Sequence, residues 1–396
     1  MRLFISRDEH LRRTDRARAE AHRRGRDALV LFSPTQIFYL TGFAFIATER
    51  PIALAVADHV TALFVPRLEE EHAAMHAAVD RIAAYPEYPG EQHPMNRLAG
   101  LLADLGLAKA RLAVDGDGYA GVMGYRGPRL SEVLPDASVQ PMRDLIEDMI
   151  MIKSHEEIEL IRESARWGNL AHGLLQQYTQ PGSIESEVSS RASHEATMAM
   201  VMALGPEYRP LSWTSPGARA GYRGQIGKQS AVAHSMTTNA RIMPGDVLVT
   251  GASAAVGGYT SELERTMIVA PVGQEQRRLF SLMLGAQEVA FETIKPGRPC
   301  ADVDRAVRAY FEKHDLMPNW RHHVGHAMGM GIHEAPFFDI GDNTEIRPGM
   351  VFTVEPGIYV NNFAGFRHSD TLVVTETGFE MITYYPRDLE SLTISG

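Results

Sequence analysis

GHAMGMGIHEAP (residues 325–336) and VFTVEPG (351–357) are the stretches on which both the fold and the site depend. His326 and His333 flank a run of glycine and methionine, and the segment GGYTSELERT (257–266) carries further carboxylates. Titratable groups of these kinds in neighbouring motifs are typical of the inside of a catalytic cleft. The three segments therefore predict an enzyme.

Composition sets limits on the class of protein. The chain has 396 residues, of which 44% are hydrophobic and 22% charged, enough for a large core and two domains. Its net charge of −10 argues against a nucleic-acid partner, because such binding depends on Lys and Arg that neutralise phosphates. Cys300 is the only cysteine, so one chain can form neither a disulfide nor a cysteine zinc site.

The N-terminal 27 residues are rich in arginine and superficially similar to a targeting segment. Four acidic residues interrupt the arginines and no apolar stretch follows, so a solvated amphipathic helix is expected instead. No apolar run approaches the ~20 residues that span a membrane. We expect a cytoplasmic protein without a membrane partner.

Residues 1–150 are predicted to form a smaller α/β domain. Short apolar runs, typical of buried strands, alternate with a segment of helical composition at 68–85. The expected strands are 28–32, 51–56, 61–66 and 111–116.

Residues 151–396 are predicted to form a second domain of the α+β class. Ser154 followed by Glu157 is a capping box and predicts a long helix that begins at this boundary. Further helices, grouped with a bent and mostly antiparallel sheet, favour the α+β class. The helices are expected at 181–204, 279–294 and 301–315, and the strands at 246–270, 351–360 and 369–383.

Several further motifs recur in one order along the second half. Together with the segments above, they resemble the "pita-bread" family that includes creatinase, prolidase, aminopeptidase P and methionine aminopeptidase. The resemblance implies a pita-bread catalytic domain preceded by a creatinase/prolidase-type N-terminal domain. The motifs are IKSHEEIELIRES (152–164), AHSMTTNARIMPGDVL (233–248), IKPG (294–297), RPGMVFTVEPGIY (347–359) and DTLVVTETGFE (370–380).

Peptidases of this family bind two metal ions through two Asp, one His and two Glu. The resemblance places these ligands at Gly251, Glu262, His326, Glu355 and Ser369. Glycine offers no donor, and the serine lies between His368 and Asp370, so a register slip of one residue stays open. Because paired ions need several anionic oxygens, we expect the two-metal mechanism to fail and no metal or other cofactor to be used. A single ion on the three remaining ligands is the alternative.

A cleft that keeps buried carboxylates without metal needs a cation in its working state. A guanidinium or amidinium substrate meets this need, and the resembled family includes hydrolases of creatine and of ectoine, a cyclic amidinium carboxylate. Residues 32–54 and 325–339 resemble ectoine hydrolase more than creatinase. This implies hydrolytic ring opening of ectoine to N-acetyl-2,4-diaminobutyrate, a product that a downstream deacetylase would process further.

The resemblance also implies roles for individual residues. Glu262 attacks the ring carbon or positions the attacking water, with Glu264 as the alternative. His234 acts as general base and then as general acid. The intermediate is oriented by His326 and His333, and the amidinium N–H groups are held by Glu355.

Two arginines are candidates for the substrate carboxylate, since a guanidinium makes two parallel hydrogen bonds to it. Arg367 lies beside the last ligand position. Arg50 aligns with a creatinase arginine that reaches the neighbouring subunit's cleft, which implies a homodimer.

Simpler interpretations remain for several of these features. A metal-dependent Xaa-Pro dipeptidase and a catalytically silent binding module are the alternative functions. Glu264 and Arg265 are equally expected to form a structural ion pair. Met328 and Met330 suit packing, and Trp213 with Tyr222 suits either a cover over the cleft or the core.

Overall fold

The structure is a computed structural model that describes residues 2–119, 123–212 and 216–395. Its chain forms two compact units, Ile5–Ile150 and Met151–Gly396 with Met1–Phe4. In the part of the chain that the structure describes, no helix is long and apolar enough to cross a membrane.

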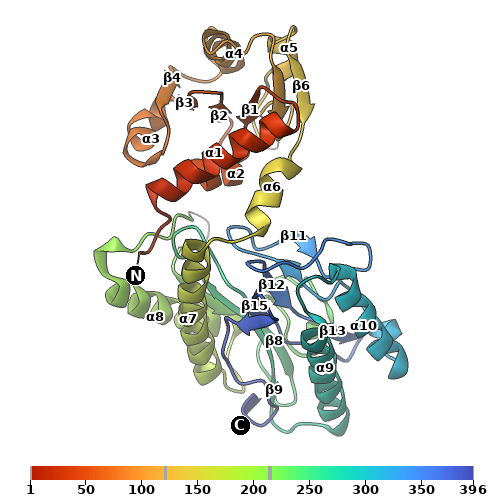
Figure 1. Ribbon diagram of the computed structural model, residues 1–396. Coiled ribbons are helices and arrows are strands. Elements are labelled where there is room, and N and C mark those ends of the chain that lie inside the picture. The colour runs from red at the N-terminus through yellow and green to blue at the C-terminus, as the bar shows by residue number, and fades with distance from the viewer. Residues whose placement is uncertain (1, 120–122, 213–215, 396) are drawn as a thin grey trace. The chain divides into compact units, whose positions relative to one another are not determined.

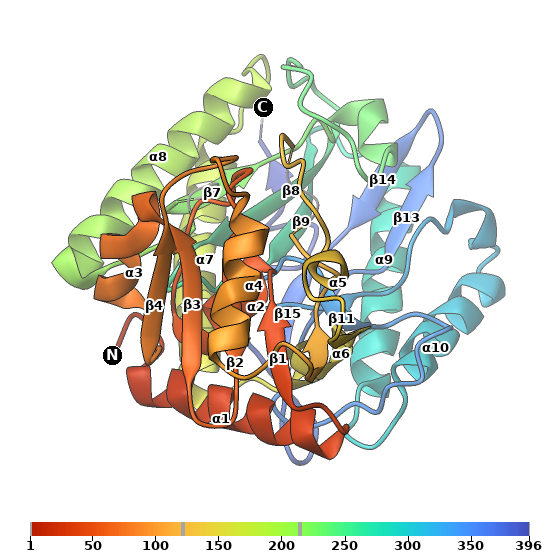
Figure 2. The same cartoon turned by 90° about the horizontal axis from the view of Figure 1, so that it is seen from above.

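The first unit is built on a six-stranded mixed sheet with the order β4-β3-β2-β1-β5-β6. Figure 2 shows β4, β3, β2 and β1 side by side. Strands β1 to β3 are buried along their whole length, as their uninterrupted apolar sequences predict. The strands are β1 (Ala28–Leu31), β2 (Ala53–Val56), β3 (Thr61–Pro66), β4 (Arg81–Tyr85), β5 (Arg111–Val114) and β6 (Ser138–Pro141).

Residues 68–85 do not form the single helical segment expected from their composition. The helix α3 ends at His76, and residues 81–85 add a parallel strand beside β3. The N-terminal helix α1 (Arg7–Arg23) is amphipathic as expected, with Ser6 accepting from the backbone N–H of Glu9 as its N-cap. The other helices of this unit are α2 (Pro34–Thr41), α3 (Glu70–His76), α4 (Pro94–Asp104), α5 (Leu130–Val133) and α6 (Asp144–Met151).

The second unit begins with the helix α7 (His155–Tyr178). Its capping box is present as predicted, because the N–H of Ser154 donates to Glu157 Oε2 at 2.8 Å and the N–H of Glu157 donates back to Ser154 Oγ at 3.4 Å. Figure 1 shows α7 and α8 on one side of the strands, and α9 and α10 on the other. The bounds of these helices are α8 (Glu185–Leu204), α9 (Gln274–Thr293) and α10 (Cys300–Lys313).

The strands of this unit pair antiparallel, except where β17 lies parallel to β9. One sheet has the order β17-β9-β8-β7, another β11-β10-β12-β15-β16, and β13 pairs with β14. The segment 351–360, expected as one strand, is divided between β12 and β13. The strands are β7 (Ala218–Gly221), β8 (Val247–Ala254), β9 (Leu263–Val269), β10 (His326–Ala327), β11 (Glu334–Phe337), β12 (Val351–Val354), β13 (Gly357–Val360), β14 (Ala364–Arg367), β15 (Asp370–Val374), β16 (Phe379–Met381) and β17 (Thr393–Ile394).

A β-bridge between Glu264 and Ser369 connects the two larger sheets. The two residues exchange backbone hydrogen bonds, each 3.0 Å long. This bridge draws the start of β9 against the start of β15. The polar residues at these strand ends therefore meet in the interior of the unit.

Candidate active site

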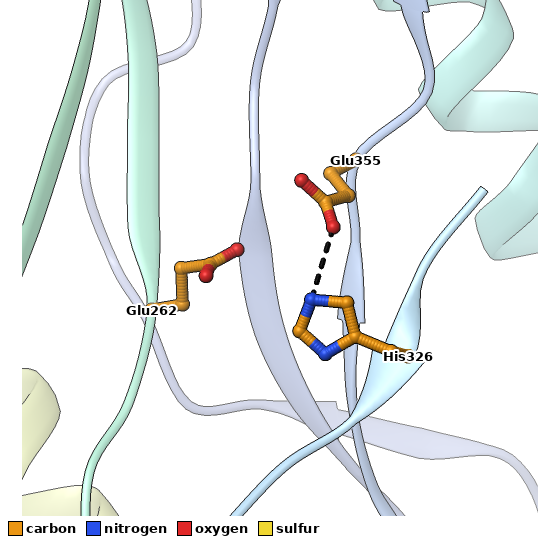
Figure 3. A group of neighbouring side chains, drawn as sticks. All are labelled: Glu262, His326 and Glu355. Carbon is orange, nitrogen blue, oxygen red and sulfur yellow. Dashed lines mark ion pairs between the residues drawn. The ribbon is translucent and has the colours of Figure 1, made fainter. Parts of the chain in front are cut away.

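Glu262, His326 and Glu355 form a compact group in the second unit, in which His326 and Glu355 are buried and Glu262 is partly exposed. One donor atom of each lies within 4.8 Å of the others (Figure 3). His326 Nε2 lies 3.1 Å from Glu355 Oε1, while its Nδ1 lies 3.1 Å from the carbonyl oxygen of Ala327, to which it donates. The three motifs singled out in the sequence are therefore brought together.

Burial and mutual charge shift the pKa values of this group in opposite directions. Burial, reinforced by the charges of Glu355 and Glu264, raises the pKa of Glu262 to about 7. Burial alone would lower the pKa of His326, but its hydrogen bond with Glu355 and that carboxylate's charge raise it to about 9. Burial alone would raise the pKa of Glu355, but the hydrogen bond with His326 and the charge of Arg367 outweigh this effect and hold that pKa well below its usual range. The group thus contains an ion pair beside a carboxyl that exchanges its proton near neutrality.

Ser369 contacts Glu262 from the segment in which the resemblance places the last ligand. Its Oγ donates to Glu262 Oε1 at 2.8 Å. The neighbours in sequence point the other way, as alternation along a strand requires. Asp370 Oδ1 accepts from Arg265 Nη2 at 2.7 Å, and His368 Nδ1 accepts from the backbone N–H of Thr266 at 3.1 Å. Of the three residues 368–370, Ser369 is therefore the one that faces Glu262.

Gly251 stands in β8 directly opposite Glu264. A Cβ built on this glycine would lie 3.6 Å from Glu264 Oε1, an ordinary van der Waals distance. Glycine thus leaves room for a Cβ here, but it supplies no donor. At the two positions where the resemblance places further ligands, Gly251 has no donor and Ser369 has a neutral hydroxyl, which does not suit a pair of metal ions. The trio of Glu262, His326 and Glu355 offers three donors, enough in number for one ion.

Glu264 is held by two arginines. Arg367 Nη2 donates to its Oε1 at 2.7 Å and Arg367 Nε contacts its Oε2, while Arg223 Nη2 donates to Oε1 at 2.6 Å. The suggested ion pair between Glu264 and Arg265 is wrong, because the Arg265 side chain binds Asp370 instead. Arg223 adopts a φ of 52°, a strained conformation for a non-glycine residue that often marks a functional site.

Arg367, expected to bind substrate, is buried and already engaged. Besides Glu264 it reaches Tyr359, to whose hydroxyl Nη1 donates at 2.9 Å, and its Nε lies 3.7 Å from Glu355 Oε2. The Tyr359 hydroxyl also lies 2.8 Å from His322 Nε2. Its position identifies Arg367 as a residue that holds two carboxylates in place.

The two remaining histidines lie toward the solvent. His333 is exposed and stacks on His326, with ring centroids 3.8 Å apart. Burial of its ring, followed by the charge of His326 and smaller effects that include His234, lowers the pKa of His333 to about 4. His234 is itself exposed and follows the 3₁₀ helix Gly227–Ala231. Its charge contributes only the smallest of these effects on the pKa of His333.

Other residues named from the sequence have different surroundings. Arg50 belongs to the first unit, where its Nη1 lies 2.6 Å from Glu49 Oε1. Trp213 lies outside the described residues. Tyr222 is buried, with its hydroxyl 2.5 Å from Thr179 Oγ1, and is a core residue. Met328 is fully buried and packs against Thr371, as its packing role predicts.

Three further residues take part in the polar network around the site without having been assigned a role from the sequence. Arg223 donates to Glu264, and the Tyr359 hydroxyl lies between His322 and Arg367. Tyr359 ends the motif RPGMVFTVEPGIY, whereas Arg223 and His322 lie outside the quoted motifs. These contacts form only after the strands have paired.

Together, the fold and this site define a hydrolase with the pita-bread architecture. Residues 159–376 match the model of metallopeptidase family M24, and residues 13–152 match the creatinase/prolidase N-terminal domain. The chain belongs to metallopeptidase family M24.

Curated relatives of the chain are named as dipeptidases. The Xaa-Pro dipeptidase of Pyrococcus furiosus is 31% identical over 246 residues, which cover 62% of this chain and 67% of the relative. The putative dipeptidase YkvY of Bacillus subtilis is 25% identical over 92% of this chain and 95% of the relative.

Solved structures share the whole fold at low identity. Dipeptidase PepE from Mycobacterium ulcerans aligns with a TM-score of 0.84 at 23% identity, covering 99% of this chain and 100% of that one. The prolidase from Pyrococcus horikoshii aligns with a TM-score of 0.79 at 22% identity, covering 96% and 99%. Similarity at this level confirms the fold class expected from the sequence.

Proposed function

We propose that this protein hydrolyses a carbon–nitrogen bond of a small cationic substrate without metal, and that the substrate is ectoine. The observation that carries the proposal is the pair Gly251 and Ser369 at two positions where the family's peptidases need metal ligands. Glu262, which such ions would otherwise neutralise, receives a hydrogen bond from the neutral Ser369 hydroxyl. An amidinium ring supplies the positive charge that this carboxylate needs.

The contacts favour Glu262 over Glu264 as the reacting carboxylate. Both oxygens of Glu264 are engaged by arginines, which lowers their nucleophilicity and limits their movement. Glu262 has no arginine partner among the ion pairs of the described residues. We therefore assign Glu262 to attack, and Glu264 to the positioning of Arg367 and Arg223.

The chemistry follows from the charge distribution of the substrate. Protonated ectoine spreads its charge over N–C–N, so the ring carbon is electrophilic. Water positioned by Glu262 adds to this carbon and gives one proton to His234, which returns it to the departing nitrogen as the C–N bond breaks; the proton left on the new hydroxyl passes to the freed amine, leaving an amide and an ammonium group. In the covalent variant Glu262 itself adds to the carbon, the ring C–N bond breaks as His234 protonates the nitrogen, and water then hydrolyses the resulting acyl imidate to the amide and free Glu262. Either route yields N-acetyl-2,4-diaminobutyrate.

Three further residues assist these steps in the proposal. Glu355 accepts hydrogen bonds from the amidinium N–H groups. His326, fixed by Glu355 and by the carbonyl of Ala327, orients the intermediate, and His333 stacks on it at the solvent side. A neutral His333 retains both a donor and an acceptor nitrogen at neutral pH.

A second candidate function is an Xaa-Pro dipeptidase. The names of the curated relatives favour it. It would require at least one ion on Glu262, His326 and Glu355, which supply two carboxylates and one imidazole. Mn²⁺ or Co²⁺ would then stimulate cleavage, and a chelator would abolish it.

One experiment separates these functions. Chelator-treated protein is incubated with ectoine, with creatine and with an Xaa-Pro dipeptide, and the products are followed by NMR. We expect turnover of ectoine alone, unchanged by chelator, and its loss in Glu262→Gln but not in the exposed control Glu390→Gln. Turnover of only the dipeptide, restored by Mn²⁺, would establish the peptidase instead. Binding of ligand without any turnover would indicate a silent binding module.

We further propose a cytoplasmic homodimer whose product passes to a separate deacetylase. An acetylated diamine needs such a step before its amines can be used. Light scattering of the purified protein tests the dimer, and a protein that stays monomeric at millimolar ectoine would contradict it.

A further inference from the structure

Glu185, the first residue of α8, is a buried carboxylate that accepts hydrogen bonds from two loops. The backbone N–H of Gly224 donates to its Oε1 at 2.5 Å. The backbone N–H groups of Thr238 and Ala240 donate to its Oε2 at 3.2 and 3.4 Å. One side chain therefore connects the Arg223 loop (residues 222–226) with the His234 loop (residues 232–240).

The Arg223 loop is fixed to the strands of the site. Arg223 Nη2 donates to Glu264 Oε1 at 2.6 Å, and the backbone N–H of Val249 in β8 donates to the carbonyl oxygen of Gln225 at 3.0 Å. Gly251, opposite Glu264, lies two residues farther along the same strand. The Arg223 loop is therefore held beside the carboxylate cluster by contacts of its own.

The two loops pack backbone against backbone. A Cβ built on Gly224 would lie 2.0 Å from the carbonyl oxygen of Met236, so only a glycine fits there, and its φ of 75° also suits a glycine. The buried side chain of Gln225 reaches across as well, because its Nε2 donates to the carbonyl oxygen of Val232 at 3.3 Å. The His234 loop is thus located by its contacts with the Arg223 loop.

The His234 loop depends on polar contacts for its position. Most of its residues are exposed, so apolar packing holds it weakly. Its N–H groups that face Glu185 need acceptors, and a carboxylate presents one acceptor oxygen to each loop. An amide presents one oxygen and one NH2 group, so an N–H of one loop would face another donor and lose its hydrogen bond. A glutamate can therefore hold both loops together, whereas a glutamine can hold only one.

We propose that Glu185 is a positioning residue, whose carboxylate ties the His234 loop to the Arg223 loop and so holds the His234 side chain in place for catalysis. Glu185 acts through these loops and does not contact the substrate. The catalytic role of His234 rests on the proposed function, whereas the three hydrogen bonds of Glu185 do not.

The first test measures whether Glu185 holds the His234 loop. Backbone hydrogen exchange is followed by mass spectrometry of peptides that cover residues 232–240. Glu185→Gln is expected to raise exchange in this loop about 10-fold or more, because the connection is broken whichever way the amide is turned. Glu187→Gln is the matched control and should leave exchange unchanged, because Glu187 is an exposed glutamate in the same turn of α8.

The second test measures the consequence for catalysis, with whichever of ectoine, creatine and glycyl-proline the parent hydrolyses. Glu185→Gln should lower kcat about 10- to 100-fold and change KM less than about 3-fold, because a displacement of ~1 Å misaligns an acid–base group. In the His234→Ala background the same change should alter the remaining rate less than about 2-fold, since no histidine is left to misplace. Glu185→Asp keeps the carboxylate on a shorter side chain and should restore part of kcat.

A purely structural role would give a different pattern, in which Glu185→Gln lowers the rate by the same factor with and without His234. That result, or unchanged exchange of residues 232–240, would overturn the inference. If Glu185→Gln does not fold, Glu185→Asp is compared in the same two backgrounds and decides in the same way. A parent that hydrolyses creatine or glycyl-proline but not ectoine would refute only the proposed function, and if none of the three is hydrolysed the exchange measurement decides the inference.

Discussion

Restoring the two missing ligands should convert the site into one that binds metal. The change is Gly251→Asp with Ser369→Glu. Space for the first exists, because a Cβ at position 251 lies 3.6 Å from Glu264 Oε1, while the second replaces a hydroxyl already 2.8 Å from Glu262 Oε1. Both new carboxylates would lie beside the three that are already present, those of Glu262, Glu264 and Glu355.

The expected cost without metal follows from that burial. An uncompensated buried charge destabilises a protein by roughly 3–5 kcal/mol, so in chelator the double variant should melt on the order of 10 °C or more below the parent. Divalent ions should reverse this, because a ligand at 1,000 times its dissociation constant adds about 4 kcal/mol. The parent, with three donors, should respond far less to the same ions.

Thermal melts in chelator and in Mn²⁺ or Co²⁺, with metal analysis after dialysis, measure both effects. The isosteric variant Gly251→Asn with Ser369→Gln is the control, because it fills the same space without charge. The reasoning would be refuted if the parent, freshly isolated, held two transition-metal atoms per chain. It would equally fail if the charged variant melted like the neutral one in chelator and bound no metal.

Three other experiments test separate parts of the structure. Glu264→Gln should lower the free energy of unfolding, measured with denaturant, by roughly 3–5 kcal/mol because it leaves buried Arg367 without its main partner. Glu262→Gln should instead abolish turnover with little loss of stability. Equal stability losses in the two variants would contradict these roles. Arg50→Met should raise the KM for ectoine without changing the oligomer measured by light scattering, and an unchanged KM would exclude this arginine from the substrate site. Burial and the charge of Arg265 lower the pKa of His172 to about 3, so the folded state resists protonation of this histidine. The free energy of unfolding should therefore fall as the pH drops from about 6.5 toward 3. His172→Gln should show a smaller fall in pH-dependent unfolding, and a profile identical to that of the parent would refute this assignment.

The sequence predicted the elements whose signals are local. The capping box at Ser154 and Glu157 needs only four consecutive residues, and it marks the start of α7 correctly. The strand 81–85 was missed because its Arg-Ile-Ala-Ala-Tyr sequence has helical composition, and only pairing with β3 decides its state. Tertiary context overrides propensity in such short segments.

The same distinction applies to the site. Motifs identified Glu262, His326 and Glu355, which lie together, since each sits in a short segment with a recognisable pattern. The partner of Glu264 could not be predicted, because Arg367 is more than a hundred residues away and an adjacent arginine offered a simpler pair.

The contacts also refine the idea of an acidic cleft. Of its three carboxylates, Glu264 is neutralised by Arg367 and Arg223, and Glu355 by His326 with help from Arg367. The unmet demand for positive charge is therefore concentrated at Glu262, whose side chain is hydrogen-bonded by a serine. A substrate with one delocalised positive charge would balance it, whereas a pair of divalent ions would exceed it unless two more carboxylates were present. Under the proposed function, Gly251 and Ser369 thus determine the charge of the preferred ligand as well as the number of donors.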